Sequence, residues 1–361
     1  MENWNYIMRV DVETLVRKSI KKAARYKFDK HHESQARTIF KALEKKHGKT
    51  DPVNLRLADT YAQEVLGDAR YAPWLRVYTA FTGTFKEGWI PDNYYGTVVV
   101  PRMKGLYGDI SGLKSLSNII FSSDTFPDIA YFVNGLFFTA NHIAVPESEV
   151  EDLVFANSEK IVFKLDSSFQ GKGILFFNRQ TFNVDTIKSL GNGVIQRFIV
   201  QHPLFNDFAS NAVATLRVTS VVDDAGLISI RACFLRLGRV ADTHIQPDRE
   251  ICVPVDISSG KLYAQGYLPD WMALDEHPDS KIKFDGISVP AFPECVGVVL
   301  ELHKKIPFAR CVGWDLTVDK NGSVQVLEWN AEHNDVKFGE ATQGPCFTDL
   351  KWERLRPLSK T

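Results

Sequence analysis

Hydrophobic positions follow a helical spacing at the start of the chain and a strand spacing later. Residues 9–48 carry apolar faces among many lysines and arginines, and residues 53–67 repeat the pattern after an Asp-Pro break, so both stretches are expected to be helical. The stretch 72–110 is rich in aromatics, Gly and Pro, which predicts short strands and loops. Together they predict an N-terminal helical and mixed region, 1–110.

The remaining chain divides into two further parts, 111–195 and 196–361. Helices are expected at 111–120, at 146–156 and, late in the chain, at 290–305. Apolar, β-branched and aromatic runs predict strands at 129–133, 161–165, 174–177, 194–199, 214–222, 228–237 and 262–263. The expected class is therefore α+β, with mostly antiparallel sheets behind a helical N-terminal region.

The segment 311–330 predicts a β-hairpin with chemistry on it. Asn-Gly in its turn supplies the positive φ that a tight turn needs. Asp315 lies on the first strand, and Glu328 and Asn330 lie two residues apart on the second, so these two face the same way. Three oxygen donors then converge, as Mg²⁺ prefers. The alternative is a surface hairpin whose polar residues face water.

The segment 161–177 predicts a strand, a polar loop and a second strand. Lys164 is the one charge inside the first strand, and its burial would require an anionic partner. The loop between the strands is small and Gly-containing, so its backbone N–H groups could bind phosphate; it consists of Ser167, Ser168, Phe169, Gln170, Gly171, Lys172 and Gly173. A plain hairpin turn and a snorkelling edge lysine are the alternatives.

Two further sets of residues suit a nucleotide. The apolar strand at 195–199 passes into a short linker, where an adenine could hydrogen-bond the backbone edge. Arginines inside apolar strands need anions, and phosphate or carboxylate suits their planar guanidinium; they are Arg217, Arg231, Arg236 and Arg239. Internal salt bridges are the alternative for each arginine.

Composition narrows the setting. The chain has 361 residues, 44% hydrophobic, with a net charge of −1, which argues against a general nucleic-acid binder. Its five cysteines lack metal or disulfide spacing, and neither a signal peptide nor a transmembrane stretch is apparent. A cytoplasmic location is therefore expected. The basic run from Arg17 to Lys30 is expected to be a solvated helix face, with a membrane-surface or partner-binding helix as the alternative.

In order, these segments resemble the ATP-grasp superfamily, and most closely its sugar-transfer-associated family. The phrases that carry the resemblance are QHP, NAVATLRVTS, RLGR, VPVDISSGKL, HPDSKIKFDGISVP, VGWDLTV and LEWN, within roughly residues 110–345. The resemblance implies a nucleotide held between two α+β subdomains, with ATP and Mg²⁺ as cofactors. A homodimer is compatible with it.

The resemblance also implies roles for individual residues. Lys114 and Lys164 would bind the nucleotide, and the loop 167–173 would cover the phosphates with Lys172 at its tip. The adenine linker would be Gln196, Arg197, Phe198 and Ile199, and the magnesium ligands Asp315, Glu328 and Asn330. Arg217 and Arg236 would neutralise the γ-phosphate or hold the acceptor. Many relatives have an arginine two residues before the metal aspartate; here that residue is Gly313, so Arg236 is the candidate for stabilising the oxyanion.

The activity implied is an ATP-dependent carboxylate–amine ligase that works through an acyl phosphate, with surface-glycan or small-metabolite substrates that include a sugar-linked acid or amine. An ATP-grasp kinase that phosphorylates a sugar or carboxylate is the alternative, and a binding protein on the same fold is a third. Polar residues after the hairpin are expected to border the acceptor, with His333 either a base for the amine or an ordinary surface histidine; they are Glu332, His333, Asn334, Asp335, Lys337, Glu340 and Gln343.

Overall fold

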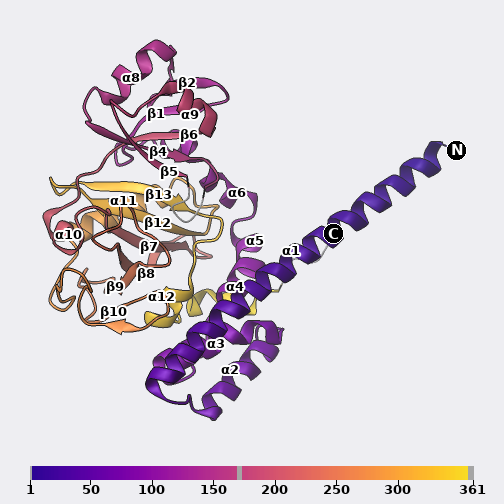
Figure 1. Ribbon diagram of the computed structural model, residues 1–361. Coiled ribbons are helices and arrows are strands. Elements are labelled where there is room, and N and C mark those ends of the chain that lie inside the picture. Colours follow the sequence, from indigo (N-terminus) through magenta and orange to yellow (C-terminus); the bar gives the residue numbers. More distant parts are fainter. Residues whose placement is uncertain (1, 169–172, 357–361) are drawn as a thin grey trace.

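The structure is a computed structural model that describes residues 2–168 and 173–356, with the backbone alone for residues 2–18 and 21 (Figure 1). Gly171 and Lys172 of the predicted phosphate-covering loop, together with Phe169 and Gln170, lie outside the described residues. No helix in the described part of the chain is long and apolar enough to cross a membrane.

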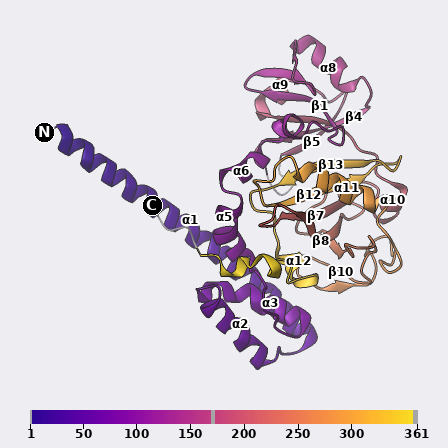
Figure 2. The ribbon, with the colours of Figure 1, turned by 180° about the vertical axis from the view of Figure 1, so that it is seen from behind.

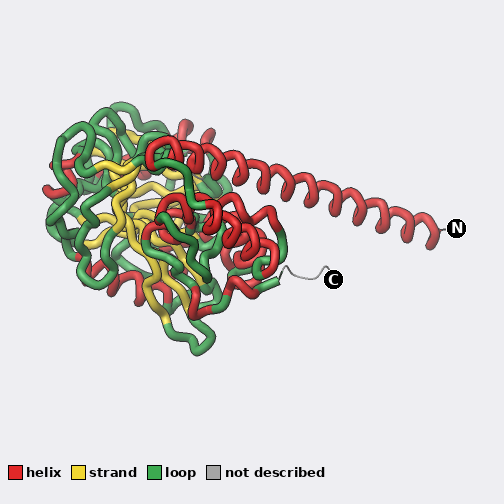
Figure 3. The backbone as a smooth tube through the Cα atoms, turned by 90° about the horizontal axis from the view of Figure 1, so that it is seen from below, coloured by secondary structure: helices red, strands yellow, loops and turns green. Residues whose placement is uncertain are grey.

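The N-terminal region is helical, and its first helix projects far from the rest of the molecule (Figures 1 and 3). The expected helices within 9–48 form one continuous helix, α1 (Glu2–His47), because no Gly or Pro interrupts that stretch. Its second half packs on the body through buried Ala36, Ile39 and Leu43. Helix α2 (Pro52–Glu64) starts at the N-cap Asp51, whose side chain accepts the Val53 N–H.

The prediction of strands and loops for 72–110 was wrong, because this stretch is mainly helical. Its aromatic residues recur at helical spacing, so that Trp74 and Tyr78 share one buried face of a helix. Gly83 ends that helix in the left-handed conformation, which is a C-cap signal rather than a strand break. The helices are α3 (Ala72–Thr82), α4 (Asp92–Tyr94), the π-helical turn η2 (Tyr95–Val99), α5 (Val100–Met103) and α6 (Leu106–Asp109).

The first sheet is antiparallel, with strand order β3-β2-β1-β6-β4-β5. Its apolar face packs under helices α8 (Glu147–Phe155) and α9 (Val184–Leu190) and buries Phe163, Ile187 and Ile195. The strands are β1 (Asp128–Val133), β2 (Leu136–Thr139), β3 (Ala144–Val145), β4 (Lys160–Leu165), β5 (Ile174–Asn178) and β6 (Gly193–Arg197).

The second sheet is also antiparallel, with order β11-β10-β9-β8-β7-β12-β13. Helix α11 (Phe292–His303) covers one face, and α3 with α12 (Lys337–Thr342) lies against the other (Figure 2). Strands between two covered faces are near-continuous apolar runs. They are β7 (Thr215–Val222), β8 (Ile228–Leu237), β9 (Ile251–Pro254), β10 (Gly266–Tyr267), β11 (Ala273–Leu274), β12 (Cys311–Val318) and β13 (Val324–Asn330). The short helix α10 (Pro203–Phe208) links the two sheets.

Two smaller predictions also differ from the structure. The helix expected at 111–120 is broken into 3₁₀ turns before α7 (Ser117–Phe121), because Ser111 and Ser115 hydrogen-bond locally and to Asp166 instead of continuing a helix. The strand expected at 262–263 is only a single bridge between Val255 and Leu262, because a tight turn at Gly260 leaves no second pair.

Candidate active site

A cavity of about 1100 Å³ lies between the two sheets and reaches the N-terminal helices. Strands β4 and β6 of the first sheet line one side, and β7, β8, β12 and β13 of the second sheet line the other. Helix α1 and the segment after β13 close the far end. A concave, mixed polar and apolar volume of this size suits a nucleotide-sized ligand.

Strand pairing brings the three predicted magnesium ligands together. Asp315 on β12 is directly opposite Glu328 on β13, so both carboxylates leave the same face of the sheet. The Asn330 amide nitrogen lies 3.5 Å from an oxygen of each. Burial and then the negative charge of Asp315 raise the pKa of Glu328 above its ordinary value. A buried and a partly buried carboxylate beside an amide side chain are a donor set that fits a hard divalent cation.

Arg217 holds Asp315 from the neighbouring strand. It is directly opposite Asp315 across β7 and β12, and its guanidinium donates to both carboxylate oxygens at 2.5 and 2.9 Å. Burial acts to raise the pKa of Asp315, but the Arg217 charge outweighs it and the pKa falls below its usual range. Asp315 therefore remains ionised, and the carboxylate lone pairs that do not accept from Arg217 are available to a metal.

Arg236 lies one strand further along the same face. It binds Glu250 at 2.7 Å and lies 3.8 Å from Asp315, while part of its side chain faces the cavity. Glu250 is a site residue that the sequence did not reveal, because it precedes β9 in an irregular loop. The two arginines thus have carboxylate partners, and their contact with phosphate or acceptor remains a prediction.

The two lysines predicted to bind nucleotide lie beside the acidic cluster. Lys164 is buried and donates to the Leu327 carbonyl oxygen at 3.1 Å, next to Glu328. Burial lowers the pKa of Lys164, and Glu328 is the largest opposing influence. Lys114 donates to the Ser168 carbonyl oxygen at 2.9 Å and lines a small crevice that includes Glu328. Both cations therefore lie near Glu328, and their contact with a phosphate chain stays a prediction.

The described ends of the predicted phosphate-covering loop turn toward Lys114. Ser167 and Gly173 both have positive φ, 53° and 81°, so the chain makes two tight changes of direction there. The Ser167 N–H donates to the Gly112 carbonyl oxygen at 2.6 Å, and Ser168 lines the cavity. The residues on either side of the loop that line the cavity are Ser168 and Ile174.

The predicted adenine linker also lines the cavity, from Gln196 to Ile199. The Gln196 amide donates to Asp128 at 2.8 Å and is thereby held in the sheet. Within the described chain, the backbone N–H and C=O of Ile199 have no hydrogen-bond partner, so one peptide edge is free. The rings of Phe176 and Phe198 pack edge to face beside it. The assignment of this edge to an adenine stays a prediction.

The far end of the cavity contains some of the residues that were predicted to border the acceptor, but not all of them. The residues that line the cavity are Glu332, His333, Asp335 and Lys337, and their role toward an acceptor stays a prediction. The prediction was wrong for three residues that the fold uses internally. Asn334 binds Lys104, Glu340 accepts the Ile90 and Cys346 N–H groups, and Gln343 binds the Cys233 backbone.

Two antiparallel sheets enclose a cavity with an acidic cluster at one end, and the family comparison identifies the fold as ATP-grasp. The model of the sugar-transfer associated ATP-grasp family matches residues 137–351, more than half of the chain. The chain therefore belongs to the sugar-transfer associated ATP-grasp family. A search of curated proteins found no significant match.

Solved ATP-grasp structures are similar at low identity. The biotin carboxylase domain of Hydrogenobacter thermophilus 2-oxoglutarate carboxylase is 11% identical, with a TM-score of 0.41, over 68% of this chain and 45% of that one. Biotin carboxylase from Campylobacter jejuni is 10% identical, with a TM-score of 0.43, over 74% and 53%. D-alanine–D-alanine ligase from Coxiella burnetii is 11% identical, with a TM-score of 0.39, over 68% and 57%. The chain spans about half the length of these proteins.

Proposed function

We propose that this protein is an ATP- and Mg²⁺-dependent ligase that joins a carboxylate to an amine through an acyl phosphate and forms ADP and phosphate. The observation that carries the proposal is the acidic cluster of Asp315, Glu328 and Asn330 on paired strands, with Lys164 beside it, in a cavity of nucleotide size. Its place would be surface-glycan or small-metabolite biosynthesis, as the family description suggests.

Each group has a physical task in such a reaction. Asp315, Glu328 and Asn330 would hold Mg²⁺, which when bound neutralises charge on the phosphates. Lys164 and Lys114 place fixed positive charge beside them and orient the phosphate chain. The residual hydrogen-bonding capacity of Arg236 suits a developing oxyanion. The Ser167–Gly173 loop would exclude water from an acyl phosphate that water destroys.

A screen of acid and amine pairs tests the proposal directly. Purified protein with ATP and Mg²⁺ should release ADP when a suitable acid is present. It should form an amide, detected by mass spectrometry, only when a matching amine is present as well. A stable phosphorylated product without any amine would assign a kinase instead. Formation of AMP and pyrophosphate would mean adenylation and would contradict the proposal.

A further inference from the structure

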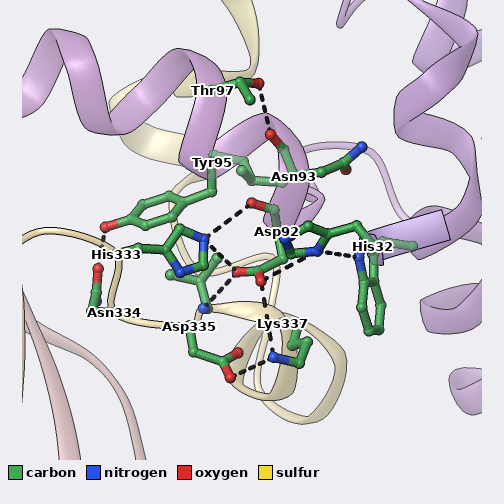
Figure 4. A network of polar contacts seen from close by, with 12 residues as sticks. His32, Asp92, Asn93, Tyr95, Thr97, His333, Asn334, Asp335 and Lys337 are labelled. Carbon is green, nitrogen blue, oxygen red and sulfur yellow. Dashed lines mark hydrogen bonds and ion pairs between the residues drawn. The ribbon is translucent and has the colours of Figure 1, made fainter. Parts of the chain in front are cut away.

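The end of the cavity away from the acidic cluster contains a buried carboxylate between two histidines. Asp92 on α4 is 1% exposed, and it lies between His32 of α1 and His333 of the segment after β13 (Figure 4). The three come from segments far apart in the sequence. Since a buried carboxylate is costly unless it is paired, its surroundings indicate what it is for.

The contacts of Asp92 aim it at His333. The Val336 N–H donates to Oδ1 of Asp92 at 3.1 Å, and Lys337 lies 3.9 Å from Oδ2. Nε2 of His333 lies 3.5 Å from Oδ1 and 3.4 Å from the Asp92 carbonyl oxygen. Both of these Asp92 oxygens are hydrogen-bond acceptors and both lie beside Nε2, so the imidazole hydrogen is expected on Nε2. Nδ1 has no partner among the described residues, and its ring lines the cavity.

The ring of His333 is fixed by close packing. Gly96 in the turn after α4 approaches so near that a Cβ there would lie 2.9 Å from Cδ2 of His333 and 2.8 Å from the Phe28 ring. Tyr95 packs edge to face on the same imidazole, with ring centroids 5.7 Å apart. A larger residue at Gly96 would displace the ring, so the N-terminal region sets the position of His333.

A metal site is the competing use of these residues, because the candidate ligand atoms of His32, Asp92 and His333 lie within 4.8 Å of one another. Two contacts oppose it. The Trp74 indole N–H donates to Nδ1 of His32 at 3.0 Å and occupies the lone pair that faces Asp92. The Lys337 ammonium already stands beside Asp92 and would repel a cation.

We propose that Asp92 and His333 form the acid–base pair that deprotonates the acceptor amine, so that the N-terminal helical region completes the active site. This rests on the proposed ligase function. His333 also lines the small crevice shared by Lys114, Ser168 and Glu328, which places it between the acceptor end and the nucleotide end. Asp92 acts as a positioning residue that also stabilises the imidazolium.

The proton and electron balance of the step is simple. An acceptor that enters as an ammonium gives one proton to Nδ1 of His333, and the freed lone pair forms the C–N bond to the acyl carbon. The bond from that carbon to the phosphate oxygen breaks with its electron pair, and phosphate leaves with the second amine proton. The titratable groups around the imidazole are Asp92 and His32 from the N-terminal helices and Asp335 from its own segment, and Glu332 and Lys337 of that segment line the same cavity.

The tautomer of His333 tests the proposal without any substrate. The measurement is NMR of the full chain labelled with ¹⁵N-histidine. The His333 signals are identified as those that disappear in His333→Gln. We expect hydrogen on Nε2 and a bare Nδ1 above neutral pH, with exposed His47 as the control. Hydrogen on Nδ1 would overturn the proposal. The proposal would also be overturned if Zn²⁺ at stoichiometric concentration shifted the NMR signals of His32 and His333 together, because that result would establish a metal site.

Catalysis then separates a base from a merely structural histidine. Hydroxylamine is unprotonated at neutral pH and needs no base, so it replaces the amine in the control reaction. His333→Gln should lose about 100-fold or more of amide formation but keep hydroxamate formation nearly unchanged. Asp92→Asn should show a smaller loss of amide formation and should likewise keep hydroxamate formation nearly unchanged. Equal loss of both reactions would contradict the proposal. If the wild type releases no ADP with any acid, the ligase function fails, whereas the tautomer still decides whether His333 can act as a base.

Discussion

The two ends of the cavity are built in opposite ways. The acidic end uses residues on adjacent strands of one sheet, where Arg217, Asp315 and Glu328 face one another in register. The acceptor end uses Asp92 and His333, which only the docking of the N-terminal helices brings together. The first end is fixed by β-pairing, whereas the second depends on how two regions of the chain pack. Phosphate chemistry and acceptor chemistry should therefore be separable by mutation.

The largest expected effect is at the acidic end. Glu328→Gln removes one of the two carboxylates proposed to hold Mg²⁺ while keeping the side-chain shape, so Mg²⁺-dependent turnover should fall about 1000-fold or more, which is several kcal/mol of transition-state stabilisation. ADP release measures the loss, and exposed Glu294→Gln on α11 is the control. Near-normal turnover of Glu328→Gln would remove this residue from the metal site.

The next effect is on stability. Arg217→Met leaves Asp315 buried without its main partner, so the free energy of unfolding should fall by about 3–5 kcal/mol, measured by urea denaturation. Adding Asp315→Leu to Arg217→Met should recover much of that loss, because the uncompensated charge is then gone. A double variant less stable than Arg217→Met would show that the ion pair is not the cause.

A smaller effect is expected on nucleotide affinity. Lys164→Met removes a buried cation beside Glu328, so MgATP binding should weaken by about 1.5–3 kcal/mol, roughly ten- to a hundred-fold. Calorimetry measures it, with exposed Lys46→Met as the matched control. His333→Gln, at the other end, should leave this affinity unchanged. Equal affinities of wild type and Lys164→Met would exclude Lys164 from the nucleotide site.

The smallest effect is the acid sensitivity of the acceptor end. Burial lowers the pKa of His32 to about 4 from 6.5. The folded state then binds fewer protons than the unfolded state between these values, so stability falls as pH drops from about 6.5 toward 4, by about 1.4 kcal/mol at pH 5.5. Urea denaturation across this range should show a shallower fall for His32→Gln. Identical slopes would mean that His32 is not held neutral by the fold.

The difference between the two ends also explains what the sequence could predict. Strand alternation placed Glu328 and Asn330 on one face, and the turn signal placed Asp315 across from them, because β-pairing is local in sequence. Asp92 gave no signal, since the stretch around it was interpreted as strands and loops and its partners are more than 50 residues away in both directions. The prediction that Glu340 borders the acceptor was wrong for a related reason. Its carboxylate accepts the Ile90 N–H, and this tertiary contact between distant segments leaves no local signal in the sequence.

Asn330 is the last residue of β13, and His333 follows three residues later on the segment that leaves the strand. A ligand that shifted this segment at one end of the cavity would also act on the other end. Thermodynamic linkage then requires reciprocity: the factor by which MgATP changes the affinity for the acceptor equals the factor by which the acceptor changes the affinity for MgATP. If that factor is large, substrates will bind in a preferred order, and the short segment will set the kinetic sequence of the whole reaction.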